Sequence, residues 1–322
     1  MKIVVPDDFP LVFTGTPAHA RLLALGEVEI HTTRGAEEPA EMIRRIGDAE
    51  IALNIRSHAS FTKAVFEACP RLRMISVWGT GVDNIDLAAA ARHGVTVANI
   101  PGVNADAVAE HAFALILAVA RKITEADREL RAGRWSKMRL TQLHGKTLGV
   151  LGLGDIGSRV VRLGLAFGMS VLAWTMRPGD GGAEALGAQS ATKDDLLKKS
   201  DIVTIHLRLA DGTKGFLGTR ELSLMKPTAI LVNTARGAIV DREALISCLK
   251  EGKIQGAGLD VFHEEPIPSG DPILSLHNTV LSPHHASSTP EVINAGLMRT
   301  VENIEQFLAG IPQNVVLPAE AQ

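Results

Sequence analysis

Arg236, Glu265 and His284 have complementary side-chain chemistry, and each follows the expected end of an apolar strand. The guanidinium of Arg236 offers a planar fork of donors that suits a carboxylate together with an adjacent carbonyl oxygen. A carboxylate that is hydrogen-bonded to an imidazole favours the imidazolium form, and an imidazolium can deliver a proton to a ketone oxygen near neutral pH. The three residue types therefore suit proton transfer to a carbonyl that lies beside a carboxylate.

Each of these residues also has an ordinary structural explanation. An isolated arginine more often caps a carbonyl or pairs on the surface, and a lone histidine is more often a satisfied structural residue. Glu264 and Glu265 could be solvated turn residues before a proline. The position of Arg236 at a strand end favours the functional interpretation, whereas His284 needs a partner. His284 and His285 are adjacent, so their side chains diverge, and no metal site is predicted.

A glycine-rich turn predicts a dinucleotide site. An apolar strand over 147–151 is followed by a G-x-G-x-x-G motif and then by a helical pattern over 156–167. The first glycine of such a motif permits a tight turn, the second lets the backbone approach the pyrophosphate, and the third allows close packing of helix on strand. Unpaired amides at the helix start face the negative charge. The residues assigned to this loop are Gly152, Gly154, Asp155, Ile156 and Gly157.

A second glycine pair, Gly79-x-Gly81, serves as a control for this motif. It too follows an apolar run, but Asn84 stands where the third glycine would be expected. Taken from the residues alone, this pair predicts an ordinary turn.

The alternation of apolar strands and helical patterns predicts an α/β protein. Strands are expected at 3–5, 28–31, 51–55, 73–77 and 95–99, and a second series at 147–151, 171–174, 202–205, 229–233 and 255–260. The second series, with helices between its strands, predicts a doubly wound parallel sheet of the Rossmann type. The helix expected over 104–121 is too apolar for a surface, so we expect it to pack between domains or against a second subunit. A last helix is expected over 290–309.

Length and composition restrict the classes of function. The 322 residues exceed the roughly 250–300 at which one core stops growing, so two domains are expected. A net charge of −3 gives no footprint for nucleic acid or for an anionic membrane. Two distant cysteines, and no secretory or membrane-spanning segment, predict a soluble cytoplasmic protein.

Several separate motifs together resemble the D-isomer-specific 2-hydroxyacid dehydrogenase family. They are GLGDIG, NTARG, GAGLDVF with the following EEP, and SPHH, in the order and spacing of that family. The segment WGTGVDNIDLAAAARHGVTVANIPG and the following AVAEH also look like the family's first-domain pattern. The resemblance spans nearly the whole chain, so it is far more specific than the glycine loop alone.

The resemblance implies a catalytic set of Arg236, Glu265 and His284. Arg236 would hold and polarise a 2-oxo acid, and His284, supported by Glu265, would pass the proton to or from the C2 oxygen. Nicotinamide would exchange the hydride with C2. The resemblance also implies cofactor contacts from His206, Thr234, Ala235 and Asp260, with Asp260 beside the nicotinamide. It implies substrate contacts from Arg56, Ser57, Thr80, Gly81 and Val82 as well as Arg236, so the turn at Gly79 becomes a carboxylate-binding loop.

The family pattern further implies a split chain. Residues 1–98 and 288–322 would form a smaller, flavodoxin-like substrate domain, and 99–287 the dinucleotide-binding domain. Substrate would bind in the cleft, and closure would expel water. The resemblance implies a homodimer formed through the cofactor domain, with which the apolar helix after Asn104 is consistent.

Two departures from the family pattern concern the cofactor. Thr175 stands about 20 residues past the glycine loop, where an NAD-preferring enzyme carries an acidic residue for the ribose hydroxyls. Without that carboxylate a 2′-phosphate is not repelled, and Arg177, after Met176, could pair with it. Arg208 replaces the proline of the family's His-x-Pro segment and adds positive charge near the adenosine end. NADP(H) is therefore favoured over NAD(H).

The expected activity is reduction of a small 2-oxo acid of the glyoxylate or hydroxypyruvate type. One alternative is a D-3-phosphoglycerate dehydrogenase, although the sequence leaves no room for an added regulatory domain. Another is a dinucleotide-sensing, corepressor-like binding protein, although no basic arm or low-complexity tract accompanies the fold. Glu265 argues against a formate dehydrogenase, which departs from the family at this glutamate.

Overall fold

The computed structural model describes residues 1–176 and 181–318, and the chain divides into two compact units. Unit 1 consists of Met1–Asn104 and Thr289–Gln322, and unit 2 is Ala105–Ser288. The boundaries expected from the sequence fell after residues 98 and 287. Each unit is built around its own parallel sheet, which confirms the expected α/β class.

Unit 1 contains a five-stranded sheet in the order β2-β1-β3-β4-β5, the order of flavodoxin-like folds. All of the pairings are parallel. The strands are β1 (Lys2–Val5), β2 (Glu27–Ile30), β3 (Ile51–Asn54), β4 (Met74–Val77) and β5 (Thr96–Ala98).

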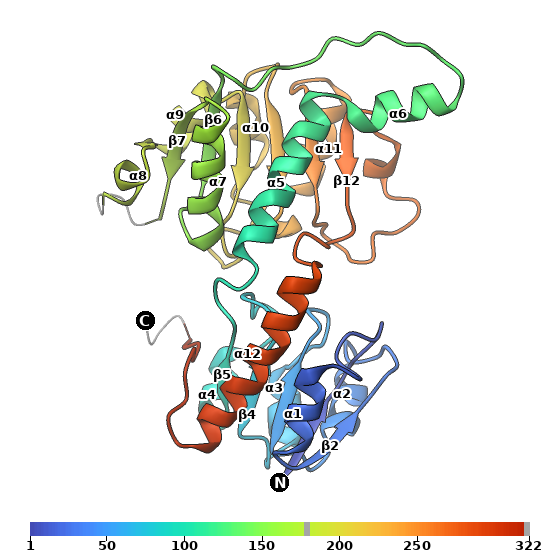
Figure 1. Cartoon of the computed structure of the whole chain (residues 1–322), viewed down its shortest axis with the longest axis vertical. Helices are drawn as coiled ribbons and strands as arrows, with labels where there is room; N and C mark the ends of the chain where they lie inside the picture. The colour runs from blue at the N-terminus through green and yellow to red at the C-terminus, as the bar shows by residue number, and fades with distance from the viewer. Residues whose placement is uncertain (177–180, 319–322) are drawn as a thin grey trace. The chain divides into compact units, whose positions relative to one another are not determined.

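Helices cover both faces of the unit 1 sheet because its strands are apolar on both sides. Ile3, Val5 and Leu53 point to one face, where they meet the first and last helices of the chain, while Val4 and Ala52 point to the other. The first face carries α1 (Pro17–Leu23) and α12 (Pro290–Leu308), and the second carries α2 (Pro39–Ile46), α3 (Lys63–Ala68) and α4 (Leu87–Arg92). The C-terminal helix therefore completes the core of the N-terminal sheet (Figure 1).

Unit 2 contains a seven-stranded sheet in the order β12-β11-β10-β9-β6-β7-β8. The strands are β6 (Thr147–Leu151), β7 (Ser170–Trp174), β8 (Gln189–Ser190), β9 (Ile202–Ile205), β10 (Ile230–Asn233), β11 (Gly256–Leu259) and β12 (Thr279–Leu281). The strand order reverses between β6 and β9. This is the doubly wound arrangement, in which a ligand binds outside the carboxyl ends of the strands at the point of reversal.

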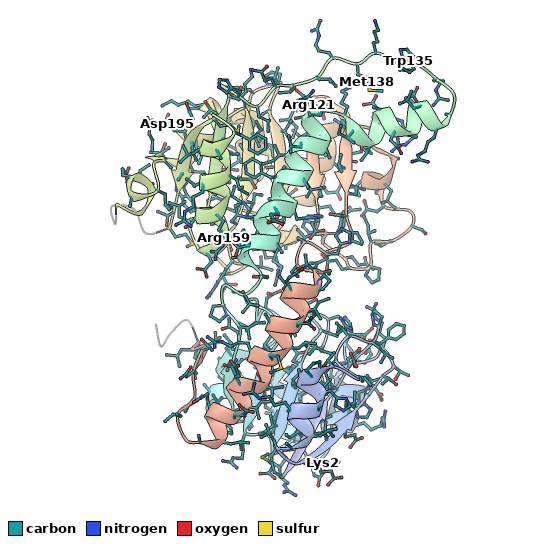
Figure 2. The ribbon with its side chains drawn as sticks, viewed as in Figure 1. Lys2, Arg121, Trp135, Met138, Arg159 and Asp195 are labelled. Atoms are coloured by element: carbon teal, nitrogen blue, oxygen red, sulfur yellow. The ribbon has the colours of Figure 1, made fainter. Side chains whose placement is uncertain are left out.

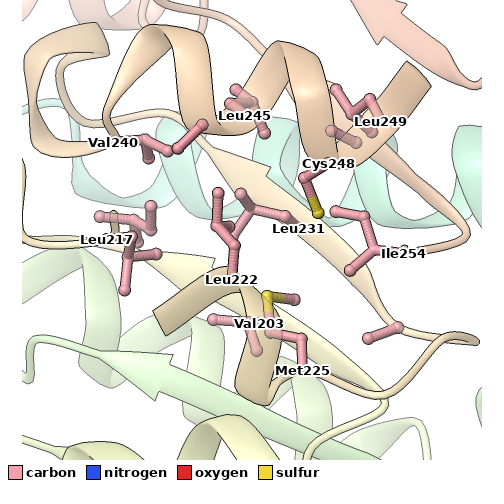
Figure 3. Packing of buried hydrophobic residues seen from close by; sticks show 14 of the residues in the cluster. Val203, Leu217, Leu222, Met225, Leu231, Val240, Leu245, Cys248, Leu249 and Ile254 are labelled. Atoms are coloured by element: carbon pink, nitrogen blue, oxygen red, sulfur yellow. The ribbon is translucent and has the colours of Figure 1, made fainter. Parts of the chain in front are cut away.

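The helices of unit 2 lie on both faces of this sheet. One face carries α5 (Ala105–Ala120), α7 (Asp155–Ala166) and α8 (Gly182–Ala185), and the other carries α9 (Lys193–Lys199), α10 (Thr219–Leu224) and α11 (Arg242–Lys250). The helix α6 (Ile123–Arg131) follows α5, and short 3-10 helices span Gly237–Ile239 and Pro272–Ser275. Figure 3 shows the second face, where Leu222 and Leu245 pack around Val203 and Leu231 of the sheet.

Side-chain caps fix where several helices begin. The Thr192 hydroxyl accepts the backbone N–H of Asp195 at 3.1 Å and so caps the start of α9. The carboxylate of Asp195, which Figure 2 labels, lies 3.6 Å from Lys199 instead of completing a capping box. Thr289 caps α12 in the same way, with Pro290 in the first turn.

The apolar helix α5 packs within unit 2, and its expected contact with a second subunit remains a prediction. Helix α5 lies beside α7 (Figure 1), and its buried residues, Phe113 and Ile116 among them, belong to the core between these helices and the sheet. The helix lies so close to the sheet that a Cβ added at Gly258 of β11 would be 2.9 Å from the Cβ of Leu115. A helix that lies this deep is apolar on most of its surface because its own sheet covers it. No described helix is both long and apolar enough to span a membrane.

Candidate active site

The residues assigned to chemistry in unit 2 lie along one edge of its sheet. Because all pairings in this sheet are parallel, the carboxyl ends of its strands share that edge. Gly152 follows β6 and His206 follows β9, at the two sides of the reversal. Thr234 follows β10, and Asp260 follows β11.

Each of the three glycines of the 152–157 loop is explained by a different local environment. Gly152 has φ +103°, and an added Cβ would lie 2.6 Å from the carbonyl oxygen of His206. At Gly157 an added Cβ would lie 1.9 Å from the carbonyl oxygen of Gly152, so only glycine lets α7 pack against the turn. At Gly154, the N-cap of α7, an added Cβ would have no atom within 4 Å. The open backbone at Gly154 and the amides of Asp155 and Ile156 leave a cradle at the positive end of a helix.

Other polar groups on this edge fit a bound dinucleotide. The hydroxyl of Thr234 is buried and has no hydrogen-bond partner among the residues that the structure describes. Its neighbour Ala235 is half-buried. An orphaned buried hydroxyl costs free energy unless a ligand satisfies it, and a cradle that a side chain would fill lies on the same edge. Both observations fit a nicotinamide dinucleotide.

The groups assigned to the adenosine end differ in charge and exposure. Burial lowers the pKa of His206 to about 3, so its imidazole is neutral at ordinary pH, and Nε2 lies 2.9 Å from the Thr204 hydroxyl. Thr175 is half-buried at the end of β7, while Met176 and Arg208 are exposed. Arg177 falls outside the described residues.

Arg236 lies on a tight turn that the side chain of Asn233 stabilises. The sequence analysis gave Asn233 no role. The Asn233 side chain accepts the N–H of Ala235 at 3.0 Å and donates to the carbonyl of Arg236 at 2.9 Å. At Gly237 an added Cβ would lie 2.2 Å from the carbonyl carbon of Phe262. Glycine therefore lets the Arg236 turn lie against the loop that carries Glu265. An asparagine at a strand end, before a turn, is the sequence signal for this arrangement.

Glu265 and His284 form a close pair on this edge. His284 Nδ1 lies 2.6 Å from Glu265 Oε2, and Glu265 Oε1 accepts the N–H of Phe262 at 2.9 Å. Burial opposes ionisation of Glu265, but the hydrogen bond and charge of His284, the Phe262 amide and the charge of Arg236 outweigh it. The pKa of Glu265 is therefore lowered from its ordinary value. The structure brings the three residues of the proposed catalytic set onto neighbouring loops.

This pairing orients the imidazole. A carboxylate only accepts hydrogen bonds, so Nδ1 of His284 carries a proton toward Glu265. The other ring nitrogen, Nε2, is then the atom that can donate or accept a proton toward a reactant. The His284 side chain is 33% exposed, so Nε2 can be reached from outside.

Asp260 is fully buried behind the His284 loop. Burial opposes its ionisation, but the nearby imidazole of His111 and the hydrogen bonds from Ser282 and the amides of Ala286 and His285 outweigh this effect. The pKa of Asp260 is therefore lowered from its ordinary value. The prediction that Asp260 lies beside the nicotinamide remains a prediction.

The residues assigned to the substrate side lie in unit 1, after the adjacent strands β3 and β4. Arg56 donates to the carbonyl of Pro10, and its Nε is buried with no hydrogen-bond partner in the described part of the chain. Ser57 beside it is exposed. In the second loop the carbonyl of Thr80 accepts the side chain of Asn99 at 2.7 Å. Gly81 and Val82, which follow it, are half-buried.

Two further residues near His284 had been given no functional role. They are His111 and Ser282, which the sequence analysis touched only within the segments AVAEH and SPHH. His111 Nε2 lies 2.9 Å from the Ser282 hydroxyl, which in turn donates to Asp260 at 2.6 Å. The AVAEH segment, which contains His111, was the available signal. By contrast His263 donates to the carbonyl of Val240 at 2.8 Å, an ordinary structural contact.

A dinucleotide-binding α/β unit with an acid–base pair on its ligand edge defines an oxidoreductase class, and comparisons with known proteins identify the family. A sequence profile described as D-isomer specific 2-hydroxyacid dehydrogenase, NAD binding domain, matches residues 113–286. A glyoxylate reductase from Aeropyrum pernix is 46% identical over 257 residues, which cover 77% of this chain and 77% of that protein.

Solved structures agree with this match. An acyclic imino acid reductase in complex with NADPH and D-Arg has a TM-score of 0.89 at 34% identity, covering 98% of this chain and 100% of that one. A D-lactate dehydrogenase from Aquifex aeolicus, complexed with NAD and lactic acid, has a TM-score of 0.88 at 30% identity, covering 99% of each chain. This chain belongs to the D-isomer-specific 2-hydroxyacid dehydrogenase family, and it is an oxidoreductase that uses a nicotinamide cofactor.

Proposed function

We propose that this enzyme interconverts a small 2-oxo acid of the glyoxylate or hydroxypyruvate type and the corresponding D-2-hydroxy acid. The observation that carries the proposal is the 2.6 Å contact between His284 and Glu265, beside Arg236 on the edge that holds the glycine loop. The similarity to a glyoxylate reductase supports the choice of substrate.

In this proposal Arg236 binds the 2-oxo acid and polarises its C2 carbonyl, since a guanidinium places parallel donors on neighbouring oxygens. A bound nicotinamide supplies hydride chemistry at C2. His284 gives the proton at Nε2 to the C2 oxygen during reduction, or takes it during oxidation. Glu265 keeps the ring in the required orientation and favours its protonated form.

The two units have different roles in the proposal. Unit 2 binds the dinucleotide through Gly152, Gly154 and Gly157, with the Thr234 hydroxyl as a further donor. Unit 1 is the substrate domain, in which the backbone of 80–82 binds the substrate carboxylate and Arg56 and Ser57 contribute further contacts. The Nε of Arg56, buried and without a partner among the residues described, supports this assignment because it leaves one donor available.

We further propose that the enzyme prefers NADP(H) to NAD(H). Thr175, at the end of β7, supplies no carboxylate to repel a 2′-phosphate. The similar structures include one complex with NADPH and one with NAD, so the preference is a property to be measured in this chain.

A homodimer built through unit 2 is supported by apolar side chains that the unit leaves exposed. They lie on α6 and the segment after it, where Trp135 is 84% exposed (Figure 2); the others are Ile123, Leu130 and Leu140. An exposed apolar patch of this kind marks an interaction surface. Cys69 and Cys248 are both buried free thiols, which supports a reducing compartment such as the cytoplasm.

Steady-state oxidation of NADPH and NADH with a panel of 2-oxo acids tests the proposal. We expect turnover with glyoxylate and hydroxypyruvate, and a higher kcat/KM with NADPH. Cofactor binding without turnover on any 2-oxo acid would overturn the proposed reaction and favour a dinucleotide-sensing binding protein. Sedimentation analysis of the wild type and of Trp135→Ala tests the dimer in the same preparation.

A further inference from the structure

The loop that carries His284 is attached to the chain through Asp260. The backbone N–H of His284 donates to the Asp260 carbonyl at 2.7 Å. The N–H groups of His285 and Ala286 donate to its two carboxylate oxygens at 3.1 and 3.0 Å. The hydroxyl of Ser282 donates to the carboxylate at 2.6 Å. Donors from the whole loop over 282–286 therefore converge on one residue at the end of β11.

His284 needs this support because its backbone is unfavourable for a side chain larger than glycine. Its φ is +49°, in the left-handed region. Such a conformation is unfavourable for a residue with a Cβ and persists only where neighbouring contacts enforce it. If the loop relaxed, Nδ1 of His284 would leave Glu265, and the ring would lose its orientation.

His111 extends the same set of contacts to helix α5. Its Nε2 lies 2.9 Å from the Ser282 hydroxyl and 3.5 Å from Asp260 Oδ1. Because Ser282 donates its proton to Asp260, the serine oxygen accepts from Nε2 of His111. The ring of His285 packs edge-on against His111, with centroids 5.2 Å apart. His111 is thus the start of a hydrogen-bond chain that ends at the His284 loop.

The same residues do not form an open metal site. His111, Asp260 and His285 bring ligand atoms within 4.8 Å of one another. Both Asp260 oxygens, however, already accept N–H or O–H groups, and the Ser282 hydroxyl bonds to both His111 and the carboxylate. A cation would have to displace these donors, so the arrangement fits a hydrogen-bond chain better than a coordination site.

We propose that His111 is a positioning residue for His284 and acts through Ser282 and Asp260. The inference rests on the proposed function, in which His284 moves the proton at C2. It assigns to α5, a buried helix of the cofactor-binding unit, the task of holding the catalytic loop in its left-handed conformation. His111 itself touches neither reactant.

The test combines hydrogen exchange with kinetics. In His111→Phe, which keeps a ring but loses the donor, we expect the amides of 284–286 to exchange about tenfold faster. We also expect kcat to fall about tenfold, with KM and cofactor affinity within about twofold. His111→Gln can place an amide nitrogen near the former Nε2 and should restore both readouts. His277→Gln, an exposed histidine, is the matched control.

Ser282→Ala provides a second route to the same loss if His111→Phe folds poorly. The double variant should lose no more activity than the more severely impaired of the two single variants, because both changes interrupt one hydrogen-bond chain. Unchanged exchange at 284–286 in both variants would overturn the proposal, even if activity fell. Faster exchange with unchanged kcat would overturn it as well. If the wild type turns over no 2-oxo acid, the proposed function fails, whereas the exchange data still show whether His111 holds the loop.

Discussion

The carboxyl edges of the two sheets both carry a glycine turn, but the turns are built differently. In unit 1, Gly79 has φ +150°, an added Cβ would meet nothing within 4 Å, and the next helix, α4, begins only at Leu87. In unit 2, α7 begins at Asp155, within the motif, and Gly157 packs directly against Gly152. The comparison teaches that glycine spacing alone does not define a phosphate site. A phosphate site also needs a helix that starts on the turn and packs so closely against it that a side chain cannot fit between them.

The largest expected effect separates the chemistry of the unit 2 edge from binding at the unit 1 edge. His284→Ala and Arg236→Ala should each lower kcat by roughly 10²–10⁴-fold, because each removes a group that acts on the C2 carbonyl. Cofactor affinity, measured by fluorescence titration, should stay within about threefold. Arg56→Ala, in unit 1, should mainly raise KM. Equal losses of kcat in all three variants would contradict the division between chemistry at the unit 2 edge and binding at the unit 1 edge.

The next effect concerns the two glycine turns directly. Gly157→Ala should weaken cofactor binding by about 100-fold and lower Tm, because its Cβ would lie 1.9 Å from the Gly152 carbonyl oxygen. Gly154→Ala has open space, so Tm should hold while cofactor affinity falls. Gly79→Ala should leave cofactor affinity within about twofold, and Gly212→Ala, which also faces open space, is the control. Weakened cofactor binding in Gly79→Ala would contradict the comparison.

A smaller effect is expected for the pH profile of Glu265→Gln. The lowered pKa of Glu265 means that the carboxylate stays ionised throughout the neutral range and favours a protonated partner. Glutamine removes this charge, so the alkaline limb of the kcat/KM profile for reduction should move to lower pH. The measurement is kcat/KM between pH 5 and 9. An unmoved alkaline limb would show that Glu265 does not tune the proton donor.

The smallest expected effect is on cofactor choice at the unit 2 edge. Thr175→Asp adds a carboxylate that hydrogen-bonds ribose hydroxyls and repels a 2′-phosphate. The ratio of kcat/KM for NADH to that for NADPH should rise by roughly fivefold. Thr175→Asn is the control, because asparagine has the shape of aspartate without its charge. An unchanged ratio in the aspartate variant would place the 2′-phosphate elsewhere.

The elements themselves could be predicted from local pattern. The strands at 147–151 and 202–205 were correctly placed, because apolar runs are local signals. Helix α5 was found, but the surface that covers it was not predictable, since an evenly apolar helix looks the same whether its own sheet or a partner covers it. Gly256 and Gly258 of β11 lie close to α5, and glycines in a strand are a sequence sign of close packing. Only the fold reveals which helix they face.

The site was predictable only in part, for a related reason. Position at strand ends selected Arg236 and His284 and made Glu265 a candidate partner of His284. Only the resemblance turned that candidate into an expected pair, because neither spacing nor composition fixes which loops meet. The contact of His111 with Ser282 joins a helix to a loop far along the chain. No periodicity marks a contact of that kind.

The return of α12 to the N-terminal sheet sets an order for folding during synthesis. Until residues 290–308 leave the ribosome, Ile3, Val5 and Leu53 have only the short helix α1 to cover them on that face, and the Ser76 hydroxyl lacks its acceptor, the carbonyl of Thr300. The contiguous segment Ala105–Ser288 is complete before then and can form its own core first. The earliest residues to be translated are therefore among the last to reach their final packing.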